Sequence, residues 1–254
     1  MLFDTHAHFN DNRFKYDRDE AIKSAHESGV SYILNVSYNI SSLEQSVSLS
    51  RRYSYIYAAV GIHPHYSKDM NTEVLDKIRT LAENKKVVGI GEIGLDYYRD
   101  LSPRDDQKKL FVRQIDLAKD LKLPIIVHIR DANEDALNVL KDEDAKAVGG
   151  IIHSFSGDVN MARQVLDNNF YISVGGPVTY HNTRNLVDVI KFIPDDRLLI
   201  ETDCPYLTPE PFRGKRNDSS LVRLVAEKIA EIKGMSFEEI ANITTNNAKR
   251  LFNI

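Results

Sequence analysis

The chain repeats one local pattern along almost its whole length. Short runs rich in valine, isoleucine and tyrosine recur eight times, each followed by a longer amphipathic stretch. Near-continuous apolar strands that alternate with helices are typical of a parallel sheet covered on both faces. The expected strands are Leu2–His6, Ser31–Val36, Tyr55–Val60, Val87–Glu92, Pro124–His128, Gly150–His153, Tyr171–Val174 and Leu198–Asp203.

Eight such units favour a closed barrel. The sequence therefore predicts an α/β fold of the (β/α)8 TIM-barrel class, built as one domain over residues 1–254, a usual length for this class. Helices are expected over Asp17–Ser28, with Gly29 as the C-cap, and over Pro103–Leu121. The segment Asn217–Ile254 is also helical in pattern and would pack against the barrel. A doubly wound sheet with a two-helix tail is the competing fold.

Composition excludes several classes of protein. Cys204 is the single cysteine, so no internal disulfide can form, which fits a reducing compartment. A formal net charge of −4 argues against non-specific nucleic-acid binding through bulk charge. No apolar run approaches the roughly 18 residues of a membrane span, and the first residues do not predict a secretory signal. We expect a cytoplasmic monomer.

The barrel prediction places function at the carboxyl ends of the strands. Six of the eight histidines follow strands in this way, and the exceptions are His26 and His181. The strand ends read Thr5-His6-Ala7-His8, Gly61-Ile62-His63-Pro64-His65, Gly91-Glu92-Ile93-Gly94-Leu95-Asp96, Val127-His128-Ile129-Arg130-Asp131, His153-Ser154-Phe155-Ser156-Gly157 and Glu201-Thr202-Asp203-Cys204-Pro205.

His6 and His8 lie two residues apart on an expected strand, so their side chains point to the same side. Both imidazoles can therefore share one metal ion in the barrel mouth, with Asp4 as a supporting residue. The alternative is that they are polar end-caps of the strand. That alternative loses weight because other strands place His128, His153 and carboxylates at equivalent positions.

Two carboxylates fit the same site. Glu92 lies among glycines and has two oxygens, which can contact two metals about 3.5–4 Å apart; the alternative is a buried glutamate paired with Arg99 or Arg130. Asp203 could ligate a metal and orient or deprotonate the attacking water; the alternative is a helix N-cap. Glu201 is a possible support for a neighbouring ligand.

Substrate contacts are expected from two loops. His63 or His65 could contact a substrate phosphate, or could simply stabilise the loop. A basic loop follows the last strand and could bind phosphate, as TIM barrels often do there, or could be a solvated charged loop. The basic residues of this loop are Arg213, Lys215 and Arg216. Aromatic residues beside the motifs, which either stack on bases or pack, are Tyr97, Tyr98, Phe155 and Tyr206.

Taken together, the six strand-end motifs resemble those of the TatD family of metal-dependent deoxyribonucleases, a branch of the amidohydrolase superfamily. The similarity spans essentially the whole chain, with the motifs in the family's order. Each motif alone is weak, whereas the set is highly specific. One departure is visible, because the family often reads Arg-Asn-Glu-Pro where this chain has Arg216-Asn217-Asp218-Ser219, which weakens any transfer of loop contacts.

The resemblance implies a TIM barrel with two divalent metal ions (Mg²⁺, Mn²⁺ or Zn²⁺) that cleaves phosphodiester bonds of DNA exonucleolytically, with His63 near the phosphate. It also implies two ligand sets. One metal would be held by His6, His8, Glu92 and Asp203, and the other by Glu92, His128 and His153.

Two other functions stay open. The same metals could serve a lactonase, a cyclic amidase or a phosphotriesterase acting on a small molecule, because a fold does not fix a function. The expected fourth strand does not end in a lysine, unlike some of these relatives, which favours the nuclease. The third hypothesis is a metal-binding protein without catalysis.

Overall fold

In the computed structural model, which describes residues 1–69 and 71–254, eight parallel strands pair in sequence order from β1 to β8. A parallel bridge between Ala7 and Cys204 brings the two ends of the sheet together, so the barrel is nearly closed. This order confirms the TIM-barrel prediction and excludes a doubly wound sheet, in which the order would reverse. The strands are β1 Leu2–Ala7, β2 Val30–Val36, β3 Ile56–Val60, β4 Val87–Asp96, β5 Ile125–Arg130, β6 Gly150–Ile152, β7 Phe170–Val174 and β8 Leu198–Ile200.

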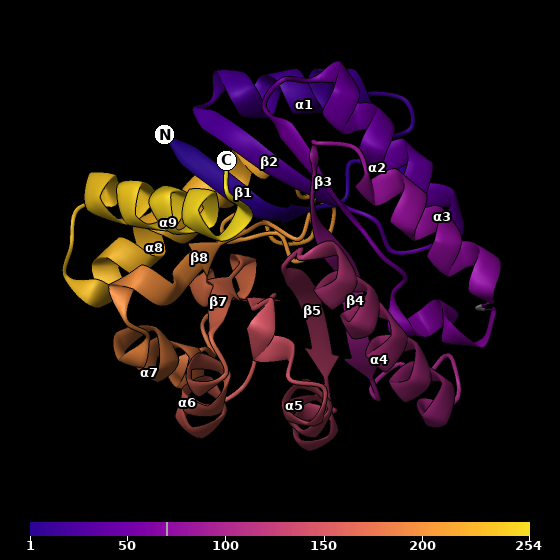
Figure 1. The fold of residues 1–254 in the computed structure, drawn as a ribbon. Coiled ribbons are helices and arrows are strands. Elements are labelled where there is room, and N and C mark those ends of the chain that lie inside the picture. The colour runs from indigo at the N-terminus through magenta and orange to yellow at the C-terminus, as the bar shows by residue number, and fades with distance from the viewer. Residues whose placement is uncertain (70) are drawn as a thin grey trace.

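Helices surround the strands, and the two chain ends lie close together beside β1 and α9 (Figure 1). The two helices expected over Asp17–Ser28 and Pro103–Leu121 form as α1 and α4, and the helical segment expected over Asn217–Ile254 forms α8 and α9. The helices are α1 Arg18–Glu27, α2 Ile40–Arg52, α3 Thr72–Ala82, α4 Arg104–Leu121, α5 Asn133–Asp142, α6 Val159–Asp167, α7 Arg184–Phe192, α8 Val222–Lys233 and α9 Phe237–Phe252. Among the residues described, none of these helices combines the length and apolarity that crossing a membrane requires.

The inside of the barrel is filled by an apolar cluster to which every strand contributes. Phe3, Val88, Ile126, Tyr171 and Leu199 belong to this cluster and are buried. Helix α9 adds Ala248 and Phe252 to it, and the rings of Phe3 and Phe252 lie 6.0 Å apart. The amino ends of the strands are therefore covered by α9, which leaves the carboxyl ends for polar side chains.

Six strands match the predicted bounds to within two residues, whereas two end three or more residues away from the prediction. Strand β4 continues past Glu92 to Asp96, with a register shift against β5 between Gly91 and Ile93. Strand β8 stops at Ile200, so Asp203 lies in the following loop and not on the strand. The backbone of Asp203 has φ = 55°, a left-handed conformation that aspartate tolerates better than most residues.

Close approach of β3 and β4 depends on a glycine. A Cβ atom at Gly61 would lie 2.7 Å from the carbonyl carbon of Gly91, directly before Glu92. We expect Gly61→Ala to lower the free energy of unfolding by about 1–3 kcal/mol, because β4 must move to accommodate the methyl group. Urea denaturation followed by circular dichroism measures this, with Gly175→Ala, whose Cβ would meet its nearest atom at 3.5 Å, as the control. Equal stability of the two variants would contradict the prediction.

Candidate metal centre

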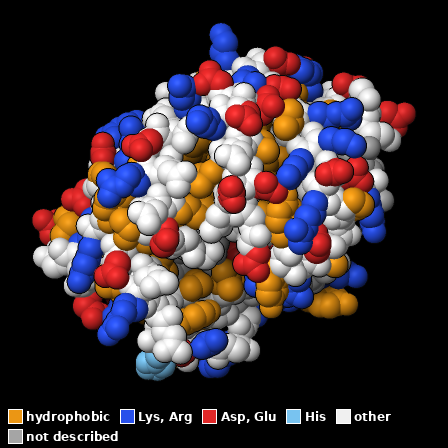
Figure 2. Space-filling model, turned by 90° about the horizontal axis from the view of Figure 1, so that it is seen from below, with side chains coloured by type: hydrophobic (Ala, Val, Ile, Leu, Met, Phe, Trp, Pro, Cys, Tyr) orange, Lys and Arg blue, Asp and Glu red, His pale blue; other side chains and the backbone are white. Residues whose placement is uncertain are grey.

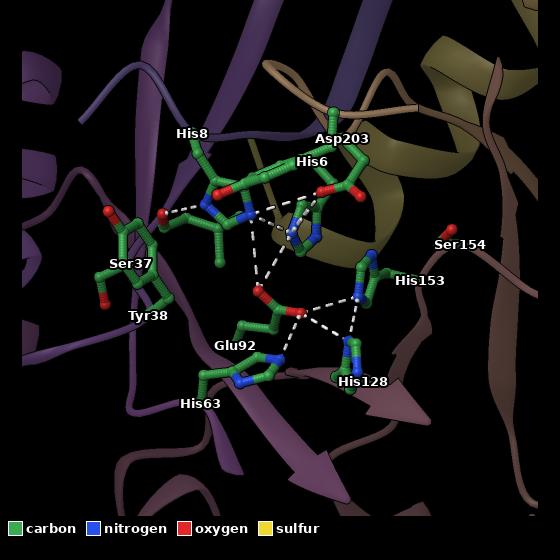
Figure 3. A network of polar contacts seen from close by, with 12 residues as sticks. His6, His8, Ser37, Tyr38, His63, Glu92, His128, His153, Ser154 and Asp203 are labelled. Atoms are coloured by element: carbon green, nitrogen blue, oxygen red, sulfur yellow. Dashed lines mark hydrogen bonds and ion pairs between the residues drawn. The ribbon is translucent and has the colours of Figure 1, made fainter. Parts of the chain in front are cut away.

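The six side chains expected to bind metal meet at the carboxyl end of the barrel. They come from β1, the segment after it, β4, β5 and the segments after β6 and β8. Figure 3 shows their polar atoms pointing toward one another around a single carboxylate. The residues brought together are His6, His8, Glu92, His128, His153 and Asp203.

One group of four atoms approaches the spacing of a coordination shell. The Nε2 atoms of His6 and His8 lie 3.1 Å apart, and each lies 3.5 Å from Oε2 of Glu92. Oδ1 of Asp203 lies 3.5 Å from His8 Nε2 and 3.9 Å from His6 Nε2. Ligand atoms placed tetrahedrally at about 2.0–2.2 Å from one ion lie about 3.3–3.6 Å apart. These four residues could therefore hold one metal ion.

A second group faces the other oxygen of the same glutamate. Oε1 of Glu92 lies 2.9 Å from both His128 Nδ1 and His153 Nε2, and these two nitrogens are 3.1 Å apart. His63 approaches from a third side, with Nε2 3.6 Å from the same oxygen. Glu92 thus separates two clusters of imidazole nitrogens, which is the position of a bridging carboxylate.

Three of the histidines are fixed through their second ring nitrogen. His8 Nδ1 lies 2.9 Å from the carbonyl oxygen of Val36, which can only accept a hydrogen bond. His128 Nε2 lies 3.2 Å from Asp96, and His153 Nδ1 lies 3.3 Å from Glu201. Each ring therefore donates at its outer nitrogen and directs the other nitrogen into the centre, as metal-ligating histidines usually do.

The buried carboxylates require positive charge from their surroundings. Burial alone would raise the pKa of Glu92, but the surrounding histidines, His153 most of all, lower it well below its ordinary value. Burial alone would lower the pKa of His153, but Glu92 and Glu201 raise it well above its ordinary value. Protons on both His128 and His153 would bring two cationic rings within 3.1 Å. One divalent cation supplies the charge without that repulsion, so the donor set fits a metal.

Arginine does not balance this charge. Among the residues that the structure describes, Glu92 forms ion pairs with histidines alone. Arg99 and Arg130, the partners considered in the alternative interpretation of Glu92, are exposed, and the guanidinium of Arg130 lies 4.3 Å from the centre of the Tyr98 ring. The centre is therefore a histidine–carboxylate cluster and not a salt bridge to arginine.

Known proteins resemble this chain over its whole length. Residues 3–253 match the sequence model of the family described as TatD related DNase. The chain belongs to the TatD family. It is 53% identical to a protein of Bacillus subtilis (strain 168) named uncharacterized metal-dependent hydrolase YabD, and the match covers the full length of both chains. It is 33% identical, again with full coverage of both chains, to a protein of Erwinia tasmaniensis named 3'-5' ssDNA/RNA exonuclease TatD.

Solved structures of TatD proteins share the fold. The crystal structure of the TatD homologue YJJV from Escherichia coli K12 superposes with a TM-score of 0.93 and 31% identity, covering 100% of this chain and 98% of that one. An organophosphorus hydrolase from Deinococcus radiodurans is similar in fold alone, with a TM-score of 0.64 and 13% identity. The chain is thus a member of a family of metal-dependent hydrolases.

Two buried carboxylates support the centre of this TatD protein from behind. Glu201 accepts hydrogen bonds from His153 Nδ1 and from the backbone N–H of Ser154. It also lies near His6, whose ring stacks on that of His153 at 3.9 Å. Asp4, predicted as a supporting residue, accepts a hydrogen bond from the backbone N–H of His6, and its carboxylate also accepts hydrogen bonds from the hydroxyls of Thr202 and Ser219 and from the Thr202 N–H. It therefore anchors the loop that presents Asp203, and burial raises its pKa to about 7.

Asp96 adjoins the centre, a position that the sequence motifs contained without indicating its contacts. Its Oδ2 lies 3.2 Å from His128 Nε2 and 2.9 Å from His65 Nε2. Burial alone would raise the pKa of Asp96, but hydrogen bonds from these two rings lower it below its ordinary value. The carboxylate thus orients His128 and also accounts for the position of His65.

His63 is held as a neutral ring. Its pKa lies well below the ordinary value, mainly because the ring is buried. Nδ1 accepts a hydrogen bond from the backbone N–H of His65 at 3.2 Å. In a neutral imidazole the other nitrogen then carries the proton, so Nε2–H of His63 points toward the second group.

The basic loop after β8 divides into two parts. Arg216 forms an ion pair with Asp17 and lies over the ring of Phe14. Arg213 and Lys215 are exposed and form no ion pair within the described ranges 1–69 and 71–254. Of the aromatic residues expected near substrate, Phe155 is buried, and Tyr97 is hydrogen-bonded to Asp135. Tyr98 and Tyr206 are exposed.

The hydrogen bond from His128 to Asp96 can be tested separately from hydrolysis. We expect Asp96→Asn to weaken metal binding about 10–100-fold, because an amide accepts the hydrogen bond less strongly and removes a negative charge behind the ring. Calorimetric titration of the metal-depleted protein with Mn²⁺ or Zn²⁺ measures the change. Asp142→Asn, an exposed position on α5, is the matched control. Unchanged affinity with an intact fold would show that Asp96 does not support the centre.

Proposed function

We propose that this chain, as one domain over residues 1–254, hydrolyses phosphodiester bonds of DNA with two divalent metal ions. One observation carries the proposal: the two oxygens of Glu92 face two separate groups of imidazole nitrogens. The proposed ligands are His6, His8, Glu92 and Asp203 for one ion, and Glu92, His128 and His153 for the other. Mg²⁺, Mn²⁺ and Zn²⁺ all accept ligand sets that mix imidazole and carboxylate.

Different side chains have different proposed roles in the reaction. Bound metals would supply Lewis-acid chemistry that activates water and neutralises charge on phosphate oxygens. Asp203 directs Oδ1 toward His6 and His8, and its side chain is 14% exposed, so it can orient the attacking water or accept its proton. His63 would donate Nε2–H to a phosphate oxygen, a role that suits a neutral ring.

The names of relatives and the charges at the mouth favour a nucleic-acid substrate. Relatives that are 33% and 34% identical are named 3'-5' ssDNA/RNA exonucleases. Arg99 follows β4 and Arg130 is the last residue of β5, and both are exposed and form no ion pair in the described part of the chain. Figure 2 shows basic and acidic side chains interspersed over the face it presents. Attraction of an anionic strand would therefore depend on the metals, these arginines and the Arg213–Lys215 loop.

A small-molecule hydrolase is the second candidate. The fold similarity to an organophosphorus hydrolase, at 13% identity, shows the barrel and nothing of the substrate. A phosphotriester, a lactone and a cyclic amide should be assayed beside DNA. The cytoplasmic location and the monomeric state stay predictions.

The experiment follows digestion of single-stranded and double-stranded oligonucleotides with Mg²⁺, Mn²⁺ or Zn²⁺, with and without a chelator. We expect digestion that needs metal and is lost with the chelator. Asp203→Asn should lower kcat about 10²- to 10⁴-fold, the usual contribution of a group that positions or accepts a proton. Asp167→Asn, exposed on α6, is the control.

The outcomes separate the candidate functions. Full activity of Asp203→Asn would refute the role given to that residue. Metal-dependent turnover of a lactone, an amide or a phosphotriester with no digestion of DNA would favour the small-molecule hydrolase. Metal binding without turnover of any of these substrates would favour a non-catalytic protein.

A further inference from the structure

A pocket of about 230 Å³ lies beside the metal centre, where β2 and β3 end. None of the residues that form it is charged. Two of them are large apolar side chains with substantial exposure, Ile40 at 42% and Tyr66 at 38%. Exposed apolar groups beside a functional centre often mark a binding surface. The lining residues are Asn39, Ile40, Ser41, Ile62 and Tyr66.

The pocket and the metal centre share the same short stretches of backbone. The N–H of His63 donates to the carbonyl oxygen of Tyr38 at 2.9 Å, and the N–H of Tyr66 donates to the carbonyl oxygen of His63 at 3.0 Å. Tyr38 and His63 face the centre (Figure 3), whereas their chain neighbours Asn39 and Ile62 line the pocket. A ligand in the pocket would therefore lie next to a phosphate bound in the centre.

Aromatic rings connect the two places. The ring of Tyr38 lies 5.4 Å from that of the proposed ligand His8, edge to face. The ring of Tyr66 lies 6.3 Å from that of Tyr38. The ring of Tyr38 thus lies between His8 in the metal centre and Tyr66 in the wall of the pocket.

The polar atoms of the pocket are few. Oδ1 of Asn39 is already used, because it accepts hydrogen bonds from the N–H of Ser42 and the hydroxyl of Ser41. Its Nδ2 forms no hydrogen bond with any described residue, and Asn39 is partly exposed. The pocket therefore offers an aromatic face, aliphatic side chains, one amide donor and the hydroxyls of Ser41 and Tyr66. This combination suits an uncharged planar group with hydrogen-bond acceptors on its edge.

We propose that this pocket binds the nucleobase of a nucleotide that adjoins the scissile phosphate, with the base stacked on Tyr66. The assignment rests on the proposed nuclease function and adds a base-binding subsite to it. Base stacking tolerates every base, since each has a π face. These few polar groups add little discrimination, so the subsite would secure a strand end without reading its sequence.

The test compares an intact single-stranded oligonucleotide with oligonucleotides that carry an abasic residue at the 3′ or the 5′ terminus. For the wild type we expect one of the two abasic substrates to show a KM about tenfold higher, with kcat nearly unchanged. Tyr66→Ala should raise KM for the intact strand by a similar factor, within the roughly 5- to 150-fold range of stacking on one ring, and leave KM for that abasic strand unchanged. Tyr66→Phe should behave as the wild type.

Tyr16→Ala is the matched control, because Tyr16 is 93% exposed and lies outside the pocket. Thermal unfolding shows whether each variant folds. If the wild type digests intact and abasic strands with the same KM, the base subsite is refuted while the nuclease function stands. If Tyr66→Ala raises KM equally for both strands, the ring does not contact the base, and the subsite is refuted again. If the wild type digests no strand, the proposed function itself fails, and the subsite with it.

Discussion

The carboxylate of Glu92 is the charge around which the barrel mouth is arranged. It is buried, and burial of an ionised carboxylate costs several kcal/mol unless it is paired. Five histidines place a ring nitrogen within 3.6 Å of its two oxygens. These rings carry their own constraints, because His8, His128 and His153 are each fixed at the far nitrogen by an oxygen acceptor. The result is a set of donor atoms, three of them on rings oriented by hydrogen bonds, that a cation can join.

Much of this arrangement could be predicted from the sequence, because it follows from two regular features. The twofold period of a strand places His6 and His8 on one side, and their Nε2 atoms indeed lie 3.1 Å apart. Parallel strands of a barrel all end at the same rim, so Glu92, His128 and His153 can meet although about 60 residues separate the first from the last. Alternating apolar and amphipathic stretches are enough to predict the eight units.

Other features depend on local conformation that no spacing encodes. The hydrogen bond between Asp96 and His128 needs β4 to run past Glu92 and the ring of His128 to adopt one orientation. The ion pair of Arg216 with Asp17 joins residues 199 apart and removes one cation from a loop that looked uniformly basic. The pocket beside Tyr66 is formed by the segments that follow β2 and β3. In each case the missing information is a rotamer or a turn, not a periodic pattern.

The two ends of the barrel contribute to folding with opposite sign. The stabilising amino end explains why the polar residues at the carboxyl end are tolerated. At the amino ends, α9 and the strands bury an uninterrupted apolar cluster, which supplies favourable free energy of folding. At the carboxyl ends, residues that follow β5, β6 and β8 adopt left-handed backbone conformations, among them Asp131, Ser154 and Asp203. Such conformations cost free energy of folding. Buried carboxylates and crowded imidazoles add to this cost. A bound cation would remove the electrostatic part of this cost. The same arrangement that destabilises the mouth without metal therefore gives the mouth its affinity for metal. Metal binding and fold stability are thereby linked.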